Sequence, residues 1–337
     1  MIKNIYNVFF DSEIWKLVNQ DNKDLLDDFL MELKQNKKSS GTISQYKADI
    51  KGIYCHIYKN LENKSILELN KRDFRTYSLW LTENCKISSA RHNRLLSSLR
   101  SLLTFAENED QYEYLVNTAS KVKGLSKESV REIIFLTDEQ IMKLKNKLIE
   151  LKEYQSATLL MLAYDSAGRR GELSQVQKYS FLDNENSNTN QVVGKRRKKF
   201  SLFYFSGTKE CAKLWLQQRG NDTIDSLWVM GRSDNKYSVT REMLYDWFLR
   251  IRDLLTEIED KETKFGSHSI RHSALQNMNN GTHYVCRELG MESGFPIEKL
   301  RLYANHESVD TTQGYLKDNS LDELESMFKI KIKINNP

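Results

Sequence analysis

Proline is almost absent from this chain, and its scarcity limits the folds open to it. Only Pro296 and Pro337 are proline among 337 residues, and 14 residues are glycine. Proline interrupts helices and central strands, and glycine commonly ends helices, so a chain poor in both has few imposed breaks. The sequence therefore favours long helices, and the predicted fold class is mainly α with a small β-sheet.

The first third of the chain predicts a helical domain over residues 21–117, preceded by a short segment, 1–20. Apolar side chains recur there every three or four residues, which is the spacing of an amphipathic helix. Four helices are expected, over residues 22–36, 42–57, 71–84 and 88–106. Thr42 or Ser44 is the expected N-cap of the second of them. A polar stretch that contains Gly124 predicts an inter-domain linker over 118–134.

A second domain is predicted over residues 135–320. It opens with Thr137 and Gln140, which have the spacing of a capping box at the start of a helix. Two short strands, 191–193 and 200–205, are expected to flank five consecutive cations and to form a hairpin. Further helices are expected over 138–151, 155–165, 211–218, 241–258, 269–278 and 297–304. The remaining residues, 321–337, form a C-terminal tail.

Composition excludes several classes of protein. No stretch approaches the roughly 18–20 apolar residues that span a bilayer, and the first 20 residues have no apolar core typical of a signal peptide. The predicted protein is therefore soluble and cytoplasmic, without a membrane partner. Its four cysteines lie singly, without the spacing of zinc ligands, so we expect reduced thiols and no metal. The net charge of +5 is too mild to identify a partner.

Three polar motifs carry the chemistry of the second domain. They are Ser166-Ala167-Gly168-Arg169-Arg170-Gly171-Glu172-Leu173, His268-Ser269-Ile270-Arg271-His272, and Asn305-His306 followed nine positions later by Tyr315. A tyrosine hydroxyl attacks a phosphodiester when fixed donors stabilise the charge on the phosphate and another group protonates the leaving oxygen. Arginine suits the first task because its planar fork stays charged, and lysine or histidine suits the second.

In these motifs, and in their order, the chain resembles the tyrosine recombinases, the phage integrase family. The resemblance covers residues 135–320 and extends to a helical core-binding domain before them. It implies no cofactor, because the covalent bond to tyrosine conserves the energy of the phosphodiester. The catalytic residues it implies are Arg169, Lys195, His268, Arg271, His306 and Tyr315. Glu172 and His272 would support them.

Several alternatives remain open on the sequence. Arg170 competes with Arg169 for the first arginine position, although the Glu172-Leu173 register favours Arg169. Lys198 is the second choice after Lys195 in the basic hairpin. The 35 positions between Arg271 and His306 are more than the family usually has, and the excess is expected around 284–296. That excess is either a loop that touches DNA or a neighbouring protomer, or a tolerated surface insertion.

The partner implied by the resemblance is double-stranded DNA at recombination sites, bound by a homotetramer that spans two such sites. The segment 321–337 is the candidate contact between protomers. An enzyme like the type IB topoisomerases, or a DNA-binding relative without catalysis, is the alternative. Candidate DNA-binding residues are polar or cationic side chains of two helices, the linker and the hairpin: Thr42, Gln45, Lys47, Lys51, Arg91, Arg94, Lys121, Lys123, Arg196 and Arg197.

Overall fold

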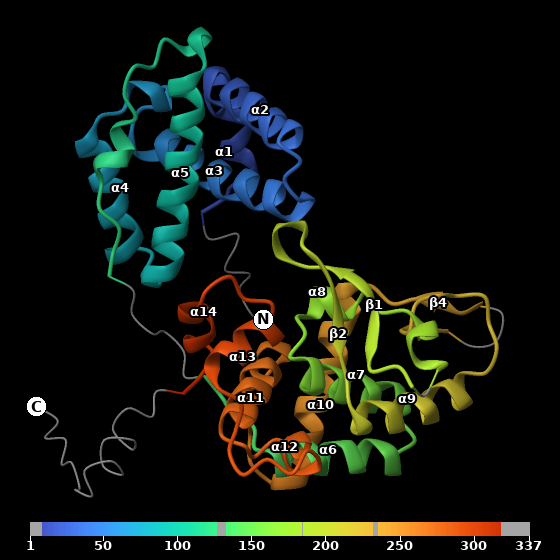
Figure 1. The fold of residues 1–337 in the computed structure, drawn as a ribbon. Coiled ribbons are helices and arrows are strands. Elements are labelled where there is room, and N and C mark those ends of the chain that lie inside the picture. The colour runs from blue at the N-terminus through green and yellow to red at the C-terminus, as the bar shows by residue number, and fades with distance from the viewer. Residues whose placement is uncertain (1–8, 127–132, 184, 232–234, 318–337) are drawn as a thin grey trace, which may run out of the picture. The chain divides into compact units, whose positions relative to one another are not determined.

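The chain divides into two compact units, residues 1–132 and 133–337, in a computed structural model (Figure 1). The structure describes residues 9–126, 133–183, 185–231 and 235–317. The tail 321–337, with its predicted contact between protomers, lies outside the described residues. Each unit has a hydrophobic core of its own. Within the described residues, no helix combines the length and apolar character that crossing a membrane requires.

The first unit is a helical bundle. Its helices are α1 (Ser12–Leu17), α2 (Gln20–Gln35), α3 (Ser40–Asn60), α4 (Lys71–Glu83) and α5 (Ser89–Asn108). The four expected helices are confirmed, and the short α1 is additional. The predicted cap of α3 is wrong: Ser39, three residues before Thr42, has extended backbone and accepts the Thr42 N–H at 3.2 Å through its hydroxyl.

The first part of the expected linker is packed against the bundle. Ala119 and Val122 are buried in the core of the first unit. Asn93 of α5 holds the Leu125 backbone on both sides, donating to its carbonyl and accepting from its N–H at 2.8 Å each. Residues 118–126 therefore belong structurally to the helical unit, while 127–132 lie outside the described residues.

The second unit places a small hairpin among helices (Figure 1). The predicted capping box is present, since Thr137 and Gln140 exchange backbone-to-side-chain hydrogen bonds of 3.0 and 3.2 Å. The predicted hairpin is also confirmed, with β1 antiparallel to β2. The elements are α6 (Asp138–Glu150), α7 (Tyr154–Ser166), α8 (Arg170–Leu173), β1 (Asn188–Val193), β2 (Lys199–Phe203), α9 (Ser206–Arg219), β3 (Val229–Met230), β4 (Tyr237–Ser238), α10 (Arg241–Glu259), α11 (Ser267–Asn279), α12 (Tyr284–Glu288), α13 (Ile297–Tyr303) and α14 (Val309–Gln313).

Helix α7 forms the centre of the second unit. Every residue from Ala157 to Ser166 is buried. A helix that is buried all round must have neighbours on each side, and α6, α9 and α11 pack against it. Helix α7 ends at Ser166, the first residue of the motif 166–173 that contains Arg169. The buried helix therefore fixes the place where this motif begins.

The expected insertion at 284–296 is partly core. Tyr284, Val285 and Cys286 are buried in α12, and the Tyr284 hydroxyl donates to Asp165 Oδ1 at 2.7 Å. A purely surface insertion is therefore the wrong description of its first residues. Further along, Gly294 passes so close to the end of α11 that a Cβ there would lie 1.8 Å from the Asn279 carbonyl oxygen.

Substituting Gly294 tests that close approach. We expect Gly294→Ala to lower the free energy of unfolding by about 1–3 kcal/mol, because the backbones must separate to admit the methyl group. Gly41→Ala is the control: it lies in α3 with nothing within 4 Å of the new Cβ, and we expect a gain of about 0.5–1 kcal/mol. Urea unfolding measures the free energy of unfolding of both variants. A Gly294→Ala protein as stable as the wild type would contradict the close packing of Gly294 against the end of α11.

Candidate active site

Tyr315 follows α14 and lies among the side chains of the motif 268–272 and of His306. The ring centroid of His272 is 4.4 Å from that of Tyr315, with the rings nearly parallel, and those of His306 and His268 are 4.9 and 5.9 Å away. The guanidinium carbon of Arg271 lies 5.1 Å from the Tyr315 centroid. Residues separated by more than 40 positions in the chain thus form one cluster around a phenol.

Arg271 is the buried centre of that cluster, with 1% of its surface exposed. Its Nη2 donates to the Ala304 carbonyl at 2.9 Å and faces His306 Nε2 at 2.6 Å, and its Nη1 donates to the Ala167 carbonyl. Ala167 and Ala304 are the C-caps of α7 and α13, so the cation sits at the negative ends of two helices. Burial lowers the pKa of Arg271 to about 10, which leaves it charged at neutral pH.

The hydrogen bonds of His306 define its tautomer. The arginine N–H can only donate, so His306 Nε2 accepts from Arg271. Nδ1 then carries the proton and donates to Thr312 Oγ1 at 3.0 Å. Burial, followed by the charges of Arg271 and Arg169, lowers the pKa of His306 to about 3. Burial also lowers the pKa of His268, with further contributions from His272 and the arginines.

NMR titration of the DNA-free protein tests the state of His306. We expect its imidazole to remain neutral, with the proton on Nδ1, from pH 8 to below pH 5. The folded protein binds a proton on His306 more weakly than the unfolded chain does. The contribution of neutral His306 to the free energy of unfolding is therefore complete above pH 6.5, and it is lost as the pH falls toward 3. A midpoint near 6.5 would contradict the buried arrangement.

Arg169 reaches the same cluster from the start of α8. Glu172, which is 2% exposed, accepts the Arg169 backbone N–H at 2.8 Å and its Nη1 at 3.0 Å. The charge of Arg169 is near enough to lower the pKa values of Arg271 and His306. Arg170 instead stacks over the ring of Tyr245 at 5.0 Å. The geometry therefore favours Arg169 over Arg170 for the site.

The basic hairpin lies beside the Arg169–Glu172 pair. A Cβ on Gly194 would be 3.2 Å from Glu172 Oε1, which shows how closely the hairpin backbone passes. At its tip Arg196 pairs with Glu307, the residue after His306. Lys195 and Lys198 are both exposed on this hairpin. The hydrogen bonds and ion pairs of the described residues join neither lysine to Tyr315.

Three of the predicted DNA-binding side chains in the first unit share one buried carboxylate. Asp49 of α3 pairs with Arg91 at 2.9 Å and with Arg94 at 3.2 Å, and it accepts from Gln45 at 3.0 Å. Burial raises the pKa of Asp49 in spite of the neighbouring Arg94. Arg91 and Arg94 therefore tie α5 to α3, while Gln45 supports the carboxylate from within α3, and their polar spacing did not reveal this structural role.

Among the other candidate DNA-binding residues, Lys51 is partly buried. Its Nζ lies 4.3 Å from the centroid of the Trp15 ring, a cation–π contact, and burial lowers its pKa. The exposed candidates are Thr42, Lys47, Lys121, Lys123, Arg196 and Arg197. Exposed cations on a helix, the packed linker and the hairpin tip suit contact with phosphates, and this assignment remains a prediction.

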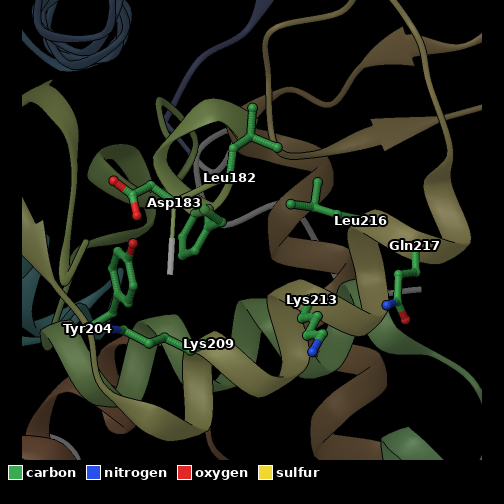
Figure 2. A pocket seen from close by; sticks show the side chains of 8 residues that line it. Leu182, Asp183, Tyr204, Lys209, Lys213, Leu216 and Gln217 are labelled. Carbon is green, nitrogen blue, oxygen red and sulfur yellow. The ribbon is translucent and has the colours of Figure 1, made fainter. Parts of the chain in front are cut away.

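Two hollows of the second unit contain none of the predicted site residues. One of about 300 Å³ lies beside α9, where Figure 2 shows Lys209 beside Tyr204 and Lys213 further along the helix. The other, about 650 Å³, is lined mainly by apolar side chains that include Phe203, Phe295 and Leu302. The cluster around Tyr315 is established by the distances between its side chains.

Two family profiles match this chain. The profile of the "Phage integrase family" matches residues 125–321, and that of the "Phage integrase, N-terminal SAM-like domain" matches residues 26–110. The chain is 26% identical over 222 residues to the SPbeta prophage-derived recombinase-like protein YomM of Bacillus subtilis (strain 168), covering 62% of this chain and 66% of that protein. It is 23% identical over 293 residues to tyrosine recombinase XerC of Leptospira interrogans, covering 86% of each.

Solved structures share the fold. The XerH site-specific recombinase, in a post-cleavage complex with its palindromic difH substrate, gives a TM-score of 0.64 at 17% identity, covering 86% of this chain and 80% of that one. A lambda integrase dimer bound to a COC′ core site gives 0.63 at 14% identity, covering 94% and 80%. The integrase profile alone spans more than half of the sequence, so this chain belongs to the phage integrase family, the tyrosine recombinases.

Proposed function

We propose that Tyr315 is the nucleophile of this site-specific DNA recombinase. Its hydroxyl attacks the scissile phosphorus, forms a 3′-phosphotyrosyl bond and releases a 5′-hydroxyl. Rejoining reverses these steps with the 5′-hydroxyl of another strand, so the number of phosphodiester bonds is conserved. The single observation that carries the proposal is the position of the Tyr315 ring among Arg271, His268 and His306.

Arg271 and Arg169 would stabilise the pentacoordinate phosphate. Arg271 lies over the Tyr315 ring, and Arg169 is close enough to influence Arg271 and His306. Each cation is held by its own protein partners: the carbonyl ends of α7 and α13 for Arg271, and Glu172 for Arg169. Donors that are fixed before the reaction need no reorganisation as charge develops, and this is the main source of electrostatic catalysis. The buried neutral form of His306 avoids a third positive charge that would repel the two arginines.

Proton transfer completes the reaction. Lys195 would protonate the leaving 5′-oxygen, because its hairpin passes beside the Arg169–Glu172 pair and its ammonium is exposed to the approaching DNA. His268 would accept the Tyr315 proton, since burial lowers its pKa and so favours the neutral imidazole that can accept a proton near pH 7. Lys198 is the alternative acid. A substrate with a 5′-thio leaving group distinguishes the two, because a thiolate leaves without being protonated. Such a substrate should restore the cleavage rate of whichever variant, Lys195→Ala or Lys198→Ala, lacks the general acid.

The DNA partner is a double-stranded recombination site, and two sites would be joined by four protomers through a Holliday junction. A solved relative, lambda integrase, is a tetramer bound to a Holliday junction. We propose the same assembly here, with 321–337 as the contact between protomers and the cytoplasm as the place of action. Exposed lysines such as Lys47, Lys121 and Lys123 would bind phosphates, so affinity would fall steeply with salt.

Trapping on nicked duplexes tests the proposal. Duplexes tiled across the DNA that flanks the gene, each with a nick near the centre, lose the cleaved fragment by diffusion and so trap the enzyme. We expect a detergent-resistant adduct on a few tiles, each leaving a free 5′-hydroxyl. Adducts on every tile, with relaxation of any supercoiled plasmid, would instead indicate an enzyme of the topoisomerase kind, and no adduct on any tile would contradict the proposal.

A further inference from the structure

One face of α11 follows the chain that carries the nucleophile. His268, His272 and Gln276 are spaced by four residues and therefore lie in a row along the helix. His268 packs edge-on to the Tyr315 ring, His272 stacks on it, and Gln276 reaches Lys317, two residues further along. The row thus runs beside Tyr315 and the residues that follow it, after α14 has ended.

Two of these contacts are hydrogen bonds to the backbone. His272 Nδ1 lies 2.9 Å from the Tyr315 carbonyl oxygen, which only accepts, so Nδ1 must carry a proton. Gln276 Oε1 accepts the Lys317 N–H at 2.6 Å, and its Nε2 donates to Asn280 Oδ1 at 2.9 Å. The Asn280 contact orients the Gln276 amide so that its oxygen faces the nucleophile segment.

We propose that His272 and Gln276 form a backbone clamp that positions Tyr315 for attack. Helix α14 has only five residues, and the chain leaves it two residues before Tyr315. Ordering such a segment during the reaction would slow each turnover, because fixing the backbone of a residue costs conformational entropy. The clamp orders it beforehand, on the same helix that carries Arg271, so nucleophile and phosphate donor keep their spacing.

The clamp rests on the proposed role of Tyr315. Its hydrogen-bonding atoms, the His272 Nδ1 donor and the Gln276 Oε1 acceptor, contact the backbone and not the reacting atoms. His272 and Gln276 are positioning residues: they act through the Tyr315 and Lys317 backbone. Asn280, at the next step of the same row, then orients Gln276. This arrangement predicts that removing the hydrogen bond, rather than the bulk of the side chain, slows strand cleavage while DNA affinity stays the same.

Paired substitutions separate the hydrogen bond from the packing. His272→Phe keeps an aromatic ring against Tyr315 but has no donor, whereas His272→Asn keeps an N–H near the position of Nδ1. Gln276→Met keeps the volume without the acceptor, whereas Gln276→Glu keeps the acceptor. We expect His272→Phe and Gln276→Met to form the covalent adduct roughly 10- to 100-fold more slowly, and the Asn and Glu variants to recover most of the rate.

Adduct rates and DNA binding are measured on the full chain with the trapping duplex. Hydrogen exchange of the Lys317 amide in the DNA-free protein gives a readout that needs no catalysis: Gln276→Met should exchange faster, and Gln276→Glu as slowly as the wild type. Equal rates in the Phe and Asn variants, or unchanged Lys317 exchange in Gln276→Met, would overturn the clamp. A wild-type protein that protects the Lys317 amide yet forms no adduct would overturn the proposed function, while the hydrogen bonds of His272 and Gln276 to this segment would remain.

Discussion

Tyr315→Phe is expected to bind its recombination site with unchanged affinity and to form no covalent adduct. The substitution removes a single oxygen atom and keeps the ring that contacts His272, His306 and Arg271. The fold and the DNA-binding surface should therefore survive, while the atom that attacks phosphorus is absent. We expect adduct formation to fall below detection, a loss larger than that caused by any supporting residue.

Tyr303→Phe provides the matched control. Tyr303 lies nearer to His306 in the sequence than Tyr315 does, but its hydroxyl donates to the Asp165 carbonyl and its ring lies near Phe203 and Phe205. We expect this variant to cleave DNA at a rate close to that of the wild type, with some loss of stability from the missing hydrogen bond. A full-strength adduct in Tyr315→Phe, or its loss in Tyr303→Phe alone, would contradict the assignment.

Arg271→Lys is expected to produce the second largest loss. Lysine keeps the charge but lacks the planar fork, and it cannot hold the Ala167 and Ala304 carbonyls and His306 while also donating to phosphate. Losing one preorganised donor to the transition state typically slows catalysis by about 10²–10³-fold, and we expect at least that for strand cleavage. Single-turnover cleavage of the trapping duplex, at saturating protein, measures the chemical step apart from binding.

Arg170→Lys is the control for that experiment, because Arg170 is adjacent to Arg169 in sequence yet stacks on Tyr245. We expect its cleavage rate to remain within a few-fold of the wild type. Thermal unfolding of Arg271→Lys must accompany the kinetics, since a buried cation that loses partners also destabilises the fold. A folded Arg271→Lys protein that cleaves at the wild-type rate would remove Arg271 from the phosphate site.

The sequence was sufficient for the longer helices and the β1–β2 hairpin because their signals are local. Periodic apolar residues, the Thr137–Gln140 box and the cationic run between two apolar strands each act within a few residues. The N-cap of α3 was harder to predict. A hydroxyl side chain occurs at Ser39, Ser40, Thr42 and Ser44. Which of them becomes the N-cap depends on how the helix that follows packs, and the structure shows that it is Ser39.

The missed parts of the site are backbone groups and long-range pairings. The carbonyls of Ala167 and Ala304 hold Arg271, yet an alanine gives no sign in the sequence that its carbonyl will meet an arginine. Asn305 has a left-handed backbone, with φ of 53°, a conformation that asparagine adopts more readily than most residues other than glycine. The spacing of His268, His272 and Gln276 was visible, but only the structure shows what that face meets.

The bond between enzyme and DNA is the most direct test of this account. An adduct trapped on a nicked duplex, trimmed with nuclease and cleaved after glutamate, separates Tyr303 from Tyr315, because Glu307 lies between them. The account predicts a nucleotide joined through its 3′-phosphate to Tyr315, on the peptide that begins at Ser308. A nucleotide on any other residue, or one joined through a 5′-phosphate, would contradict it.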